Sequence, residues 1–355
     1  MHSRFSRRVF LASAAAVAQA SRAAESEIRL PGRLRLGIYG TEGHVGDITG
    51  PLKRLPDVEF VAVAGNGAQG LAKRFPGTKV YPSLDAMLGA EKLDVAAVTN
   101  DNGGRAAAIM ACAERGVNVI AEKPFAINRR DLERVRETAA RKKIALGTIL
   151  PMRFEPHYRA MHNLMKEGTL GEIVQVAGQK SYKAAAGTQW RLHRETYGST
   201  ILWIGIHMID LMLFTTGRDI RETAGWQTRV GMPELQDQEN VSVSMFRFDN
   251  GALGELRMDY LRSAKAATHG DDRLRIAGTR GIVEWDHDRG LVLMTSERAP
   301  ARVIDLPPQG SVFIDFLEHV YNGKPSMLPE RDIWRSNEVT MAAHEAAVLG
   351  RFVKA

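Results

Sequence analysis

Predicted strands and helices alternate over residues 34–150, and this alternation constrains the fold more than any other feature of the 355-residue chain. The strand-like runs are rich in Val, Ile, Leu and Ala, as expected for buried strands. They cover residues 34–40, 58–64, 93–98, 117–121 and 144–149, and helical patterns at 68–75, 105–115 and 128–142 separate them. Strands joined through helices in this way form a doubly wound parallel sheet.

The run at 117–121 is followed directly by Glu122, Lys123 and Pro124. Charged residues after a strand often only cap it at the surface. A lysine at the carboxyl end of an inner parallel strand also lies where such sheets bind their ligands. Lys123 is therefore either a surface cap or part of a functional site, and the flanking sequence has to decide.

The first strand runs into a glycine-rich turn, Gly40–Gly46. Glycines in such a turn let backbone amides approach a phosphate at the start of a helix. The dinucleotide spacing G-x-G-x-x-G is not met, because Glu42 stands in the second glycine position, where a carboxylate opposes a pyrophosphate unless it points away. The second strand is followed by Gly65 and Asn66, not by the acid that usually binds the ribose hydroxyls, so NADP is as open as NAD.

The pattern changes after Pro151. Stretches of alternating or mixed polarity indicate an open, largely antiparallel sheet with one face solvated or facing a partner. They cover 173–177, 238–248, 254–258, 274–277 and 282–285, and closing helices are predicted at 313–321 and 333–352. The expected fold class is α/β, with a doubly wound parallel domain at 33–150, an α+β domain at 151–355, and an export signal and linker at 1–26.

The composition narrows the classes of function. The net charge is +7, but three of the charges are arginines within the first 20 residues, and no dense basic run is interleaved with aromatics. We therefore expect no nucleic acid partner. The single cysteine, Cys112, lies in an alanine-rich helical pattern and is predicted to be a buried side chain without a disulfide. The histidines lack H-E-x-x-H spacing and cysteine partners, so no metal site is expected.

The N-terminus resembles an export signal. The pair Arg7–Arg8, an apolar stretch over 12–18, and an A-x-A cleavage pattern at 18–20 occur in the order of a twin-arginine signal. A disordered basic tail is the alternative. The apolar stretch is too short to span a bilayer, and no later segment looks transmembrane. We therefore expect a soluble mature protein that is exported by the twin-arginine route to the periplasm.

Several ordered motifs together resemble the Gfo/Idh/MocA family (glucose-fructose oxidoreductase, inositol dehydrogenase and MocA). They extend over residues 33–353 and include G-V-N-V-I-A-E-K-P at 116–124, R-F-E-P at 153–156, G-T-L-G-E at 168–172, W-R at 190–191, G-I-H-M-I-D at 205–210 and G-T-R-G at 278–281. The resemblance implies an N-terminal NAD(P)-binding Rossmann domain and a C-terminal substrate domain whose sheet forms homo-oligomers. It also implies hydride transfer at a hydroxyl or carbonyl carbon of a sugar or cyclitol, which places Lys123 in a functional site.

Hydride transfer needs a base for the hydroxyl proton and a cation near the developing alkoxide. His207 is the predicted base, because imidazole titrates near neutral pH; a buried core histidine is the alternative. Lys123 is predicted to hydrogen-bond the reacting hydroxyl and lower its pKa. Asp210, on the same helical face as His207, either contacts substrate, orients a neighbour or packs between helices. The predicted cofactor contacts are Gly40, Thr41, Gly43, His44, Val45, Asn66, Asn100, Glu122 and Lys123.

The chain departs from the family pattern near the histidine. Many members carry an aspartate four residues before it, where this chain has Trp203. As a helical neighbour, its indole could pack on the His207 imidazole or form a sugar-stacking platform. Arg105 and Asp101 stand where members often have histidine and proline. The Tyr182–Arg194 segment is either a solvated loop or part of the substrate site. The predicted substrate contacts are Arg153, Tyr182, Trp190, Arg191 and Trp203.

Three functions remain open from the sequence. The first is an oxidoreductase that holds NAD or NADP tightly and recycles it, since an exported dinucleotide enzyme has no evident supply of free cofactor. The second is an NAD-dependent glycosidase or lyase that oxidises its sugar transiently, which the missing aspartate leaves open. The third is a non-catalytic sugar-binding protein that kept the fold.

Overall fold

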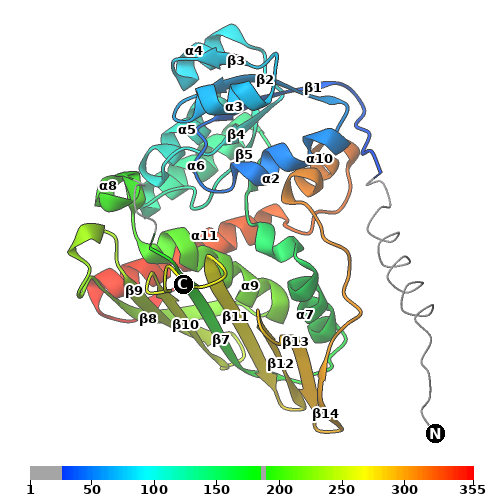
Figure 1. Ribbon diagram of the computed structural model, residues 1–355, viewed down its shortest axis with the longest axis vertical. Helices are drawn as coiled ribbons and strands as arrows, with labels where there is room; N and C mark the ends of the chain where they lie inside the picture. Colours follow the sequence, from blue (N-terminus) through cyan, green and yellow to red (C-terminus); the bar gives the residue numbers. More distant parts are fainter. Residues whose placement is uncertain (1–25, 185–188) are drawn as a thin grey trace, which may run out of the picture.

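Six parallel strands form the N-terminal sheet in the order β3-β2-β1-β4-β5-β6, which confirms the doubly wound prediction (Figure 1). The computed structural model describes residues 26–184 and 189–355, so the predicted export signal lies outside the described residues. The strands are β1 Leu34–Tyr39, β2 Val58–Ala64, β3 Lys79–Tyr81, β4 Val95–Val98, β5 Asn118–Ala121 and β6 Leu146–Thr148. The helices are α2 Val45–Thr49, η1 Gly50–Arg54, α3 Ala68–Arg74, α4 Leu84–Ala90, α5 Asn102–Glu114 and α6 Arg129–Lys142.

Local sequence explains where these elements begin and end. All four residues of β4 are buried and apolar, as an inner parallel strand requires. The side chains of Ser83, Asp101 and Asn128 accept hydrogen bonds from the first turns of α4, α5 and α6. The chain leaves β1 toward one side of the sheet and β4 toward the other, so the loops after these two strands border the crevice where doubly wound sheets bind ligands.

The C-terminal sheet has nine strands, in the order β14-β13-β12-β11-β7-β10-β9-β8-β15. Every pairing is antiparallel except that of β10 with β7, so the prediction of a largely antiparallel sheet is confirmed. The strands are β7 Ile173–Tyr182, β8 Ile220–Thr228, β9 Val241–Phe248, β10 Leu253–Asp259, β11 Gly270–Gly278, β12 Gly281–Asp286, β13 Gly290–Thr295, β14 Arg298–Arg302 and β15 Val353–Lys354.

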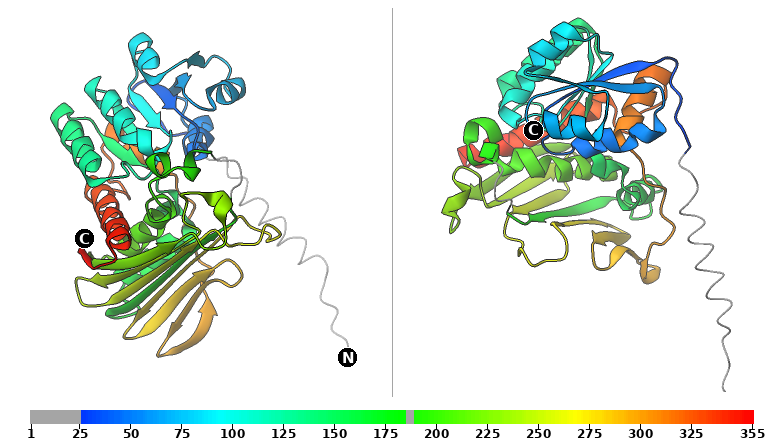
Figure 2. Two further views of the ribbon diagram at one scale, coloured as in Figure 1. Left: turned by 90° about the vertical axis from the view of Figure 1, so that its left-hand side faces the viewer. Right: turned by 45° about the horizontal axis from the view of Figure 1, so that its top comes forward.

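Helices fill the space between the two sheets. Figure 2 shows α7, α9 and α11 on one face of the nine-stranded sheet, with the N-terminal domain beyond them. Alternate residues of β9 and β10 are buried against these helices. The remaining elements are η2 Pro151–Phe154, α7 Pro156–Lys166, η3 Gln189–Leu192, α8 Arg194–Tyr197, η4 Ile201–Gly205, α9 Ile206–Thr216, η5 Pro233–Leu235, α10 Val312–Asn322 and α11 Glu330–Leu349. Phe313 and Leu317 of α10 belong to the N-terminal core, so this helix packs back onto the first domain although it follows the second domain in the sequence.

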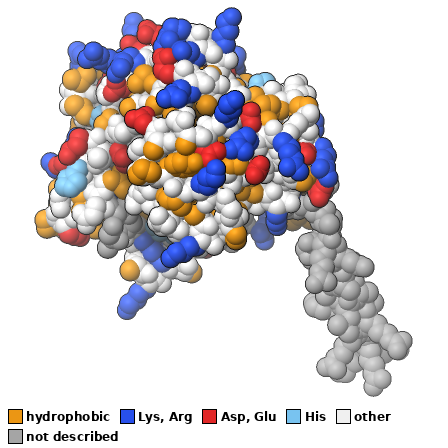
Figure 3. Space-filling model, turned by 90° about the horizontal axis from the view of Figure 1, so that it is seen from above, with side chains coloured by type: hydrophobic (Ala, Val, Ile, Leu, Met, Phe, Trp, Pro, Cys, Tyr) orange, Lys and Arg blue, Asp and Glu red, His pale blue; other side chains and the backbone are white. Residues whose placement is uncertain are grey.

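Two surface properties bear on function. Over the N-terminal domain, positive and negative side chains are interspersed (Figure 3). The helical stretch Arg194–Thr216 is long and apolar enough to cross a membrane, but 94% of its most apolar window is buried inside the protein. That burial is typical of a core helix, because residues all round it are covered by the sheet and by α11.

Candidate active site

The motif E-K-P places a charged pair in the interior, at the carboxyl end of β5. The side chains of Glu122 and Lys123 are 0% and 1% exposed. Glu122 Oε1 lies 2.7 Å from His44 Nδ1 and 3.4 Å from Lys123 Nζ. Although burial opposes ionisation, the charges of His44 and Lys123 lower the pKa of Glu122 to about 2. Glu122 is therefore a permanent anion that holds two cofactor-site residues together.

Lys123 contacts residues of both domains, Glu122 in the first and Trp203 in the second. Its Nζ donates to the backbone oxygen of Trp203 at 2.6 Å and lies 3.3 Å from the centre of the Trp203 indole. Burial lowers the pKa of Lys123 to about 7, with Arg105 and Arg191 adding to the effect and Glu122 opposing it. An amine that titrates near neutral pH can take or give a proton, which an ordinary lysine does poorly.

His207, the predicted base, lies near the start of α9. It is 4% exposed, and its ring meets that of His44 edge-on at 5.0 Å. Burial and the nearby charges of Lys123, His44 and Lys180 lower its pKa well below the ordinary value. The imidazole is therefore neutral at neutral pH, and its Nδ1 has no partner among the described residues. His207 offers a hydrogen bond to a ligand, but it is a poor acceptor of a full proton.

Trp203 does not pack on His207 as predicted. Residues Ile201–Gly205 form a turn of π-helix before α9, which changes the helical spacing on which the prediction rested. The indole covers the Lys123 ammonium and meets the Trp190 ring edge-on at 5.1 Å. At 4% exposed, it presents little surface to a sugar in this conformation. The indole instead excludes water from Lys123, which contributes to the burial that lowers the pKa of that amine.

The glycine-rich turn fits a dinucleotide. Gly40 and Gly43 have positive φ angles of 80° and 63°, and a Cβ there would lie 2.7 Å from the Asn100 backbone and 2.5 Å from Glu122 Oε1. Asn100 follows β4 across the crevice, and its Oδ1 is buried without a partner among the described residues. Glu122 Oε2 is likewise unpartnered. The two glycines let the turn pack closely on the ends of β4 and β5, and the two free acceptors fit the hydroxyl and amide donors of a bound NAD(P).

The other predicted cofactor residues surround the same crevice. Thr41 donates its hydroxyl to the backbone oxygen of Asn66 at 3.1 Å, which ties the turn to the end of β2. Val45 begins α2. Glu42 does not point at the phosphate position: its two carboxylate oxygens accept from Asn66 Nδ2 at 2.6 Å and from Trp190 Nε1 at 2.9 Å.

Arg105 links the loops after β4 and β5, a role that the sequence did not predict. It is fully buried and donates to Asn102 Oδ1 and to the backbone oxygens of Asn100, Lys123 and Pro124. Burial lowers its pKa to about 10, so it remains charged. These bonds fix the loop after β4 to the end of β5, and so fix the position of Lys123.

Asp210 and Arg153 belong to a buried structural network. Arg153 donates from Nε and Nη2 to the two oxygens of Asp210, at 3.1 and 2.6 Å, and from Nη1 to Asp332 at 2.8 Å. Ser336 donates to Asp210 at 2.7 Å. Both members of the pair are 1% exposed. In this structure the Arg153 donors are used inside the protein and not toward a substrate, and the geometry of Asp210 favours the helix-packing alternative.

The residues predicted to bind substrate in the segment Tyr182–Arg194 lie in two separate places, at the glycine-rich turn and at the end of β7. Trp190 and Arg191 stand over the glycine-rich turn, and the Arg191 guanidinium lies 5.3 and 5.1 Å from the rings of Trp190 and Trp203. Tyr182 lies at the end of β7, where its hydroxyl lies 3.2 Å from Asp272 Oδ2. Residues 185–188 of the segment lie outside the described residues.

A groove of about 680 Å³ opens beside Tyr182 and between the sheet and α7. Asp272 lines the groove, and its Oδ2 lies 3.1 Å from the fully buried Lys180 ammonium. Asp272 Oδ1 and the Tyr158 hydroxyl are buried without partners among the described residues, so both are free to bind hydroxyl groups. His157 and Trp285 stack at 3.5 Å along one wall. The sequence analysis missed these residues, because Lys180 and Asp272 meet only through the pairing of β7 with β11.

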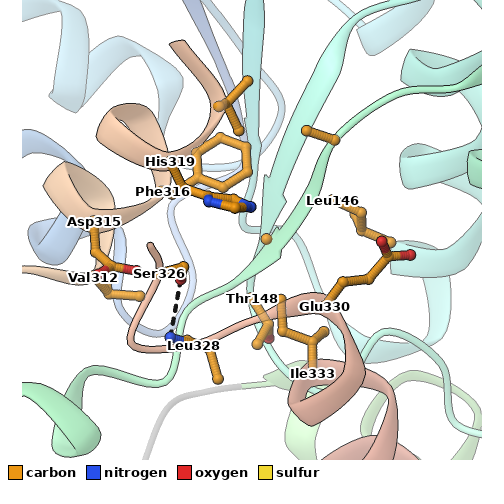
Figure 4. Close-up of a pocket in the computed structure, with 13 residues that line it drawn as sticks. Leu146, Thr148, Val312, Asp315, Phe316, His319, Ser326, Leu328, Glu330 and Ile333 are labelled. Atoms are coloured by element: carbon orange, nitrogen blue, oxygen red, sulfur yellow. Dashed lines mark hydrogen bonds between the residues drawn. The ribbon is translucent and has the colours of Figure 1, made fainter. Parts of the chain in front are cut away.

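Two other cavities lie away from Lys123 and His207. A small one of about 70 Å³ is enclosed by β6, α10 and α11, with Phe316, His319 and Ile333 on its wall (Figure 4). A larger one of about 870 Å³ lies over the Arg153 network, beside Asp332 and Trp334. None of the three cavities is lined by Lys123 or His207, and the groove at Tyr182 is the one that contains a predicted substrate residue.

Comparison with known proteins places the chain among dehydrogenases. Residues 34–149 match an oxidoreductase family with an NAD-binding Rossmann fold, and residues 158–284 match the GFO/IDH/MocA C-terminal domain. The chain is 22% identical to myo-inositol 2-dehydrogenase of Thermotoga maritima over 275 residues, 75% of this chain and 79% of that one. It is 25% identical to an NADP-dependent scyllo-inositol 2-dehydrogenase of Bacillus subtilis over 225 residues, 62% of this chain and 61% of that one.

Solved structures show the same fold over nearly the whole chain. An oxidoreductase from Thermotoga maritima superposes with a TM-score of 0.85 at 28% identity, covering 91% of this chain and all of that one. An inositol dehydrogenase homologue from Azotobacter vinelandii, solved with NAD⁺, gives a TM-score of 0.78 at 18% identity, covering 93% and 99% of the two chains.

Proposed function

Because the chain belongs to the Gfo/Idh/MocA family of NAD(P)-dependent oxidoreductases, we propose that it oxidises or reduces a hydroxyl-bearing carbon of a sugar or cyclitol. We propose further that Lys123 exchanges the proton and that neutral His207 orients the reacting oxygen. The observation that carries this proposal is the fully buried Lys123 amine, with a pKa of about 7, near the unpartnered Nδ1 of His207.

The roles follow from the protonation states. A group is most effective as general acid or base when its pKa lies near the working pH, and the pKa of Lys123 meets that condition while that of His207 does not. A bound nicotinamide accepts or donates the hydride. When the alcohol is oxidised, neutral Lys123 takes the hydroxyl proton; when a carbonyl is reduced, the ammonium returns it. The Trp203 indole has to swing away from the amine before a substrate oxygen reaches it, since the two are in contact.

The groove beside Tyr182 supports a polyhydroxylated substrate. It combines a charged pair, Lys180 and Asp272, with the free hydroxyl of Tyr158, and such groups bind the several hydroxyls of a sugar or cyclitol. The stacked rings of His157 and Trp285 offer an apolar face for the ring carbons. The charge of Lys180, the partner of Asp272, also lowers the pKa of His207, which supports a substrate position between the groove and the proton-transfer groups.

The pH dependence of turnover tests these roles. For oxidation, kcat/KM is expected to rise with pH and to level off above a midpoint near the Lys123 pKa of about 7, because only the neutral amine accepts a proton. For reduction, the sign reverses and the rate falls through the same midpoint. The Lys123→Arg variant keeps the charge but does not titrate in this range, so its residual rate is expected to lack the midpoint. The same midpoint in both proteins would reject proton exchange by Lys123.

We propose that the protein is exported folded, with its cofactor bound tightly and recycled in place. Support comes from the order of the signal-like features in residues 6–20 together with an NAD(P)-binding domain. Protein recovered from the periplasm of a Gram-negative host is expected to release near-stoichiometric nicotinamide nucleotide on acid extraction. The matched Arg7→Lys/Arg8→Lys variant is expected to stay in the cytoplasm. Export of that variant, or an exported protein without nucleotide, would contradict the proposal.

We propose that the outer face of the nine-stranded sheet forms a homo-oligomer. That face exposes Val174, Trp226, Met245 and Leu253 on β7, β8, β9 and β10, each at least half exposed. A Met245→Lys variant is expected to shift the protein to monomer in sedimentation velocity. Glu255→Gln changes the net charge of the same face by the same +1 and is the control, expected to sediment as wild type. A wild-type protein that sediments as a monomer at micromolar concentration would contradict the proposal.

A further inference from the structure

No acid follows β2 in the sequence, but the carboxylate of Glu42, in the turn after β1, lies beside the end of β2. Rossmann domains usually bind the adenosine ribose hydroxyls with an Asp or Glu at the end of the second strand. This chain has Asn66 there, and the Glu42 carboxylate from the turn after β1 lies 2.6 Å from its side-chain nitrogen. Because β1 and β2 are parallel neighbours, their carboxyl ends lie at the same edge of the sheet. The ribose position therefore faces a carboxylate after all.

The position of Glu42 is determined from three sides. Its backbone nitrogen donates to Thr99 at the end of β4, and its second carboxylate oxygen accepts from Trp190 Nε1 at 2.9 Å. Thr41 donates to the backbone oxygen of Asn66, and Gly67 is required because a Cβ there would lie 1.9 Å from Thr41 Oγ1. The turn after β1 is thus packed directly against the loop after β2, which keeps the carboxylate beside Asn66.

The charges around this edge disfavour a 2′-phosphate. The loop and first helical residues after β2, 65–69, are Gly-Asn-Gly-Ala-Gln and contain no lysine or arginine. The Arg191 guanidinium lies between the rings of Trp190 and Trp203, at 5.3 and 5.1 Å, where its charge lowers the pKa of Lys123. A 2′-phosphate, which carries close to two negative charges, would meet Glu42 without a matching cation.

We propose that Glu42 is the residue that binds the adenosine ribose and that it makes the site selective for NAD over NADP. The inference rests on the proposed function, since it concerns the cofactor of that reaction. It also assigns a role to Asn66 and Trp190 as positioning residues, which hold the carboxylate at the ribose edge.

A competition experiment that requires no turnover tests the assignment. The purified protein is dialysed against equimolar NAD⁺ and NADP⁺, and the bound nucleotides are released with acid and quantified. The wild type is expected to retain NAD. Glu42→Gln is expected to weaken NAD⁺ binding by about tenfold to a hundredfold, the usual range for losing a hydrogen bond to a charged group. The same substitution is expected to narrow the preference for NAD⁺ over NADP⁺. Glu59 is an exposed carboxylate on β2, away from the carboxyl end of that strand. Glu59→Gln is therefore the control and is expected to bind both nucleotides as the wild type does.

A second variant separates selectivity from folding. Glu42→Gln/Asn66→Asp puts an acid at the usual position and is expected to restore the preference for NAD⁺. Equal binding of both nucleotides by the wild type would overturn the inference, as would a Glu42→Gln variant that binds both nucleotides more tightly by the same factor, because Glu42 would then only repel the pyrophosphate. Binding of neither nucleotide by the wild type would contradict the proposed function itself.

Discussion

Replacing Lys123 with methionine is expected to lower kcat by about 10²- to 10⁴-fold, the usual contribution of a positioned general acid or base. Methionine keeps the unbranched side chain up to the position of Cε, while the amine that contacts the Trp203 indole and exchanges the proton is lost. The measurement is the rate of nicotinamide reduction in a single turnover, with nucleotide binding checked separately.

His207→Ala is the comparison that assigns the roles. Because burial and neighbouring charges keep His207 neutral, its loss should remove an orienting hydrogen bond, and we expect a smaller fall in kcat, of about tenfold. A fall for His207→Ala that equals or exceeds that for Lys123→Met would return the role of base to the histidine.

Replacing Asp210 with leucine is expected to lower the free energy of unfolding by about 3–5 kcal/mol, because it leaves the buried Arg153 charge without its principal partner. The double variant Arg153→Met/Asp210→Leu removes both charges and is expected to recover much of that loss. Urea denaturation at neutral pH measures both changes.

An exposed ion pair provides the control for this prediction. Arg129 and Glu345 are 43% and 30% exposed, so Glu345→Gln is expected to change the free energy of unfolding by less than about 1 kcal/mol. If Asp210→Leu costs no more than this control but abolishes turnover, Asp210 acts on the substrate and its assignment to a structural network is wrong.

The sequence predicted the elements whose local signals agree with their environment. The strand at 58–64 has the predicted bounds, because an apolar run broken only by the exposed Glu59 is followed by two residues of the turn type, Gly65 and Asn66. The helix α6 begins one residue after Asn128, which caps it as a turn residue should. The strand β8 was missed, since Arg221, Glu222 and Gly225 interrupt its apolar pattern while the adjacent strand β9 and the C-terminal strand β15 supply its pairing.

Site residues that lie in a recognisable sequence motif could be predicted. Site residues that come together from distant segments of the chain could not. Motif spacing was enough to single out Lys123 and His207 together. Their protonation states were not predictable, because burial and the charges around both residues lower both pKa values, so that the lysine and not the histidine titrates near neutral pH. Asp272 lies directly opposite Lys180 in the β11–β7 pairing, and no local pattern indicates which residues a strand register will oppose.

The central claim is that this site transfers hydride between a polyol and a bound nicotinamide, and isotope transfer tests it most directly. The purified protein is incubated with a panel of sugars and cyclitols deuterated on carbon, and the bound nucleotide is released with acid and analysed by mass spectrometry. We expect deuterium in the nucleotide for at least one substrate with the wild-type protein, and labelling about 10²- to 10⁴-fold slower with Lys123→Met. A nucleotide that stays unlabelled while a substrate is bound or converted would contradict the claim.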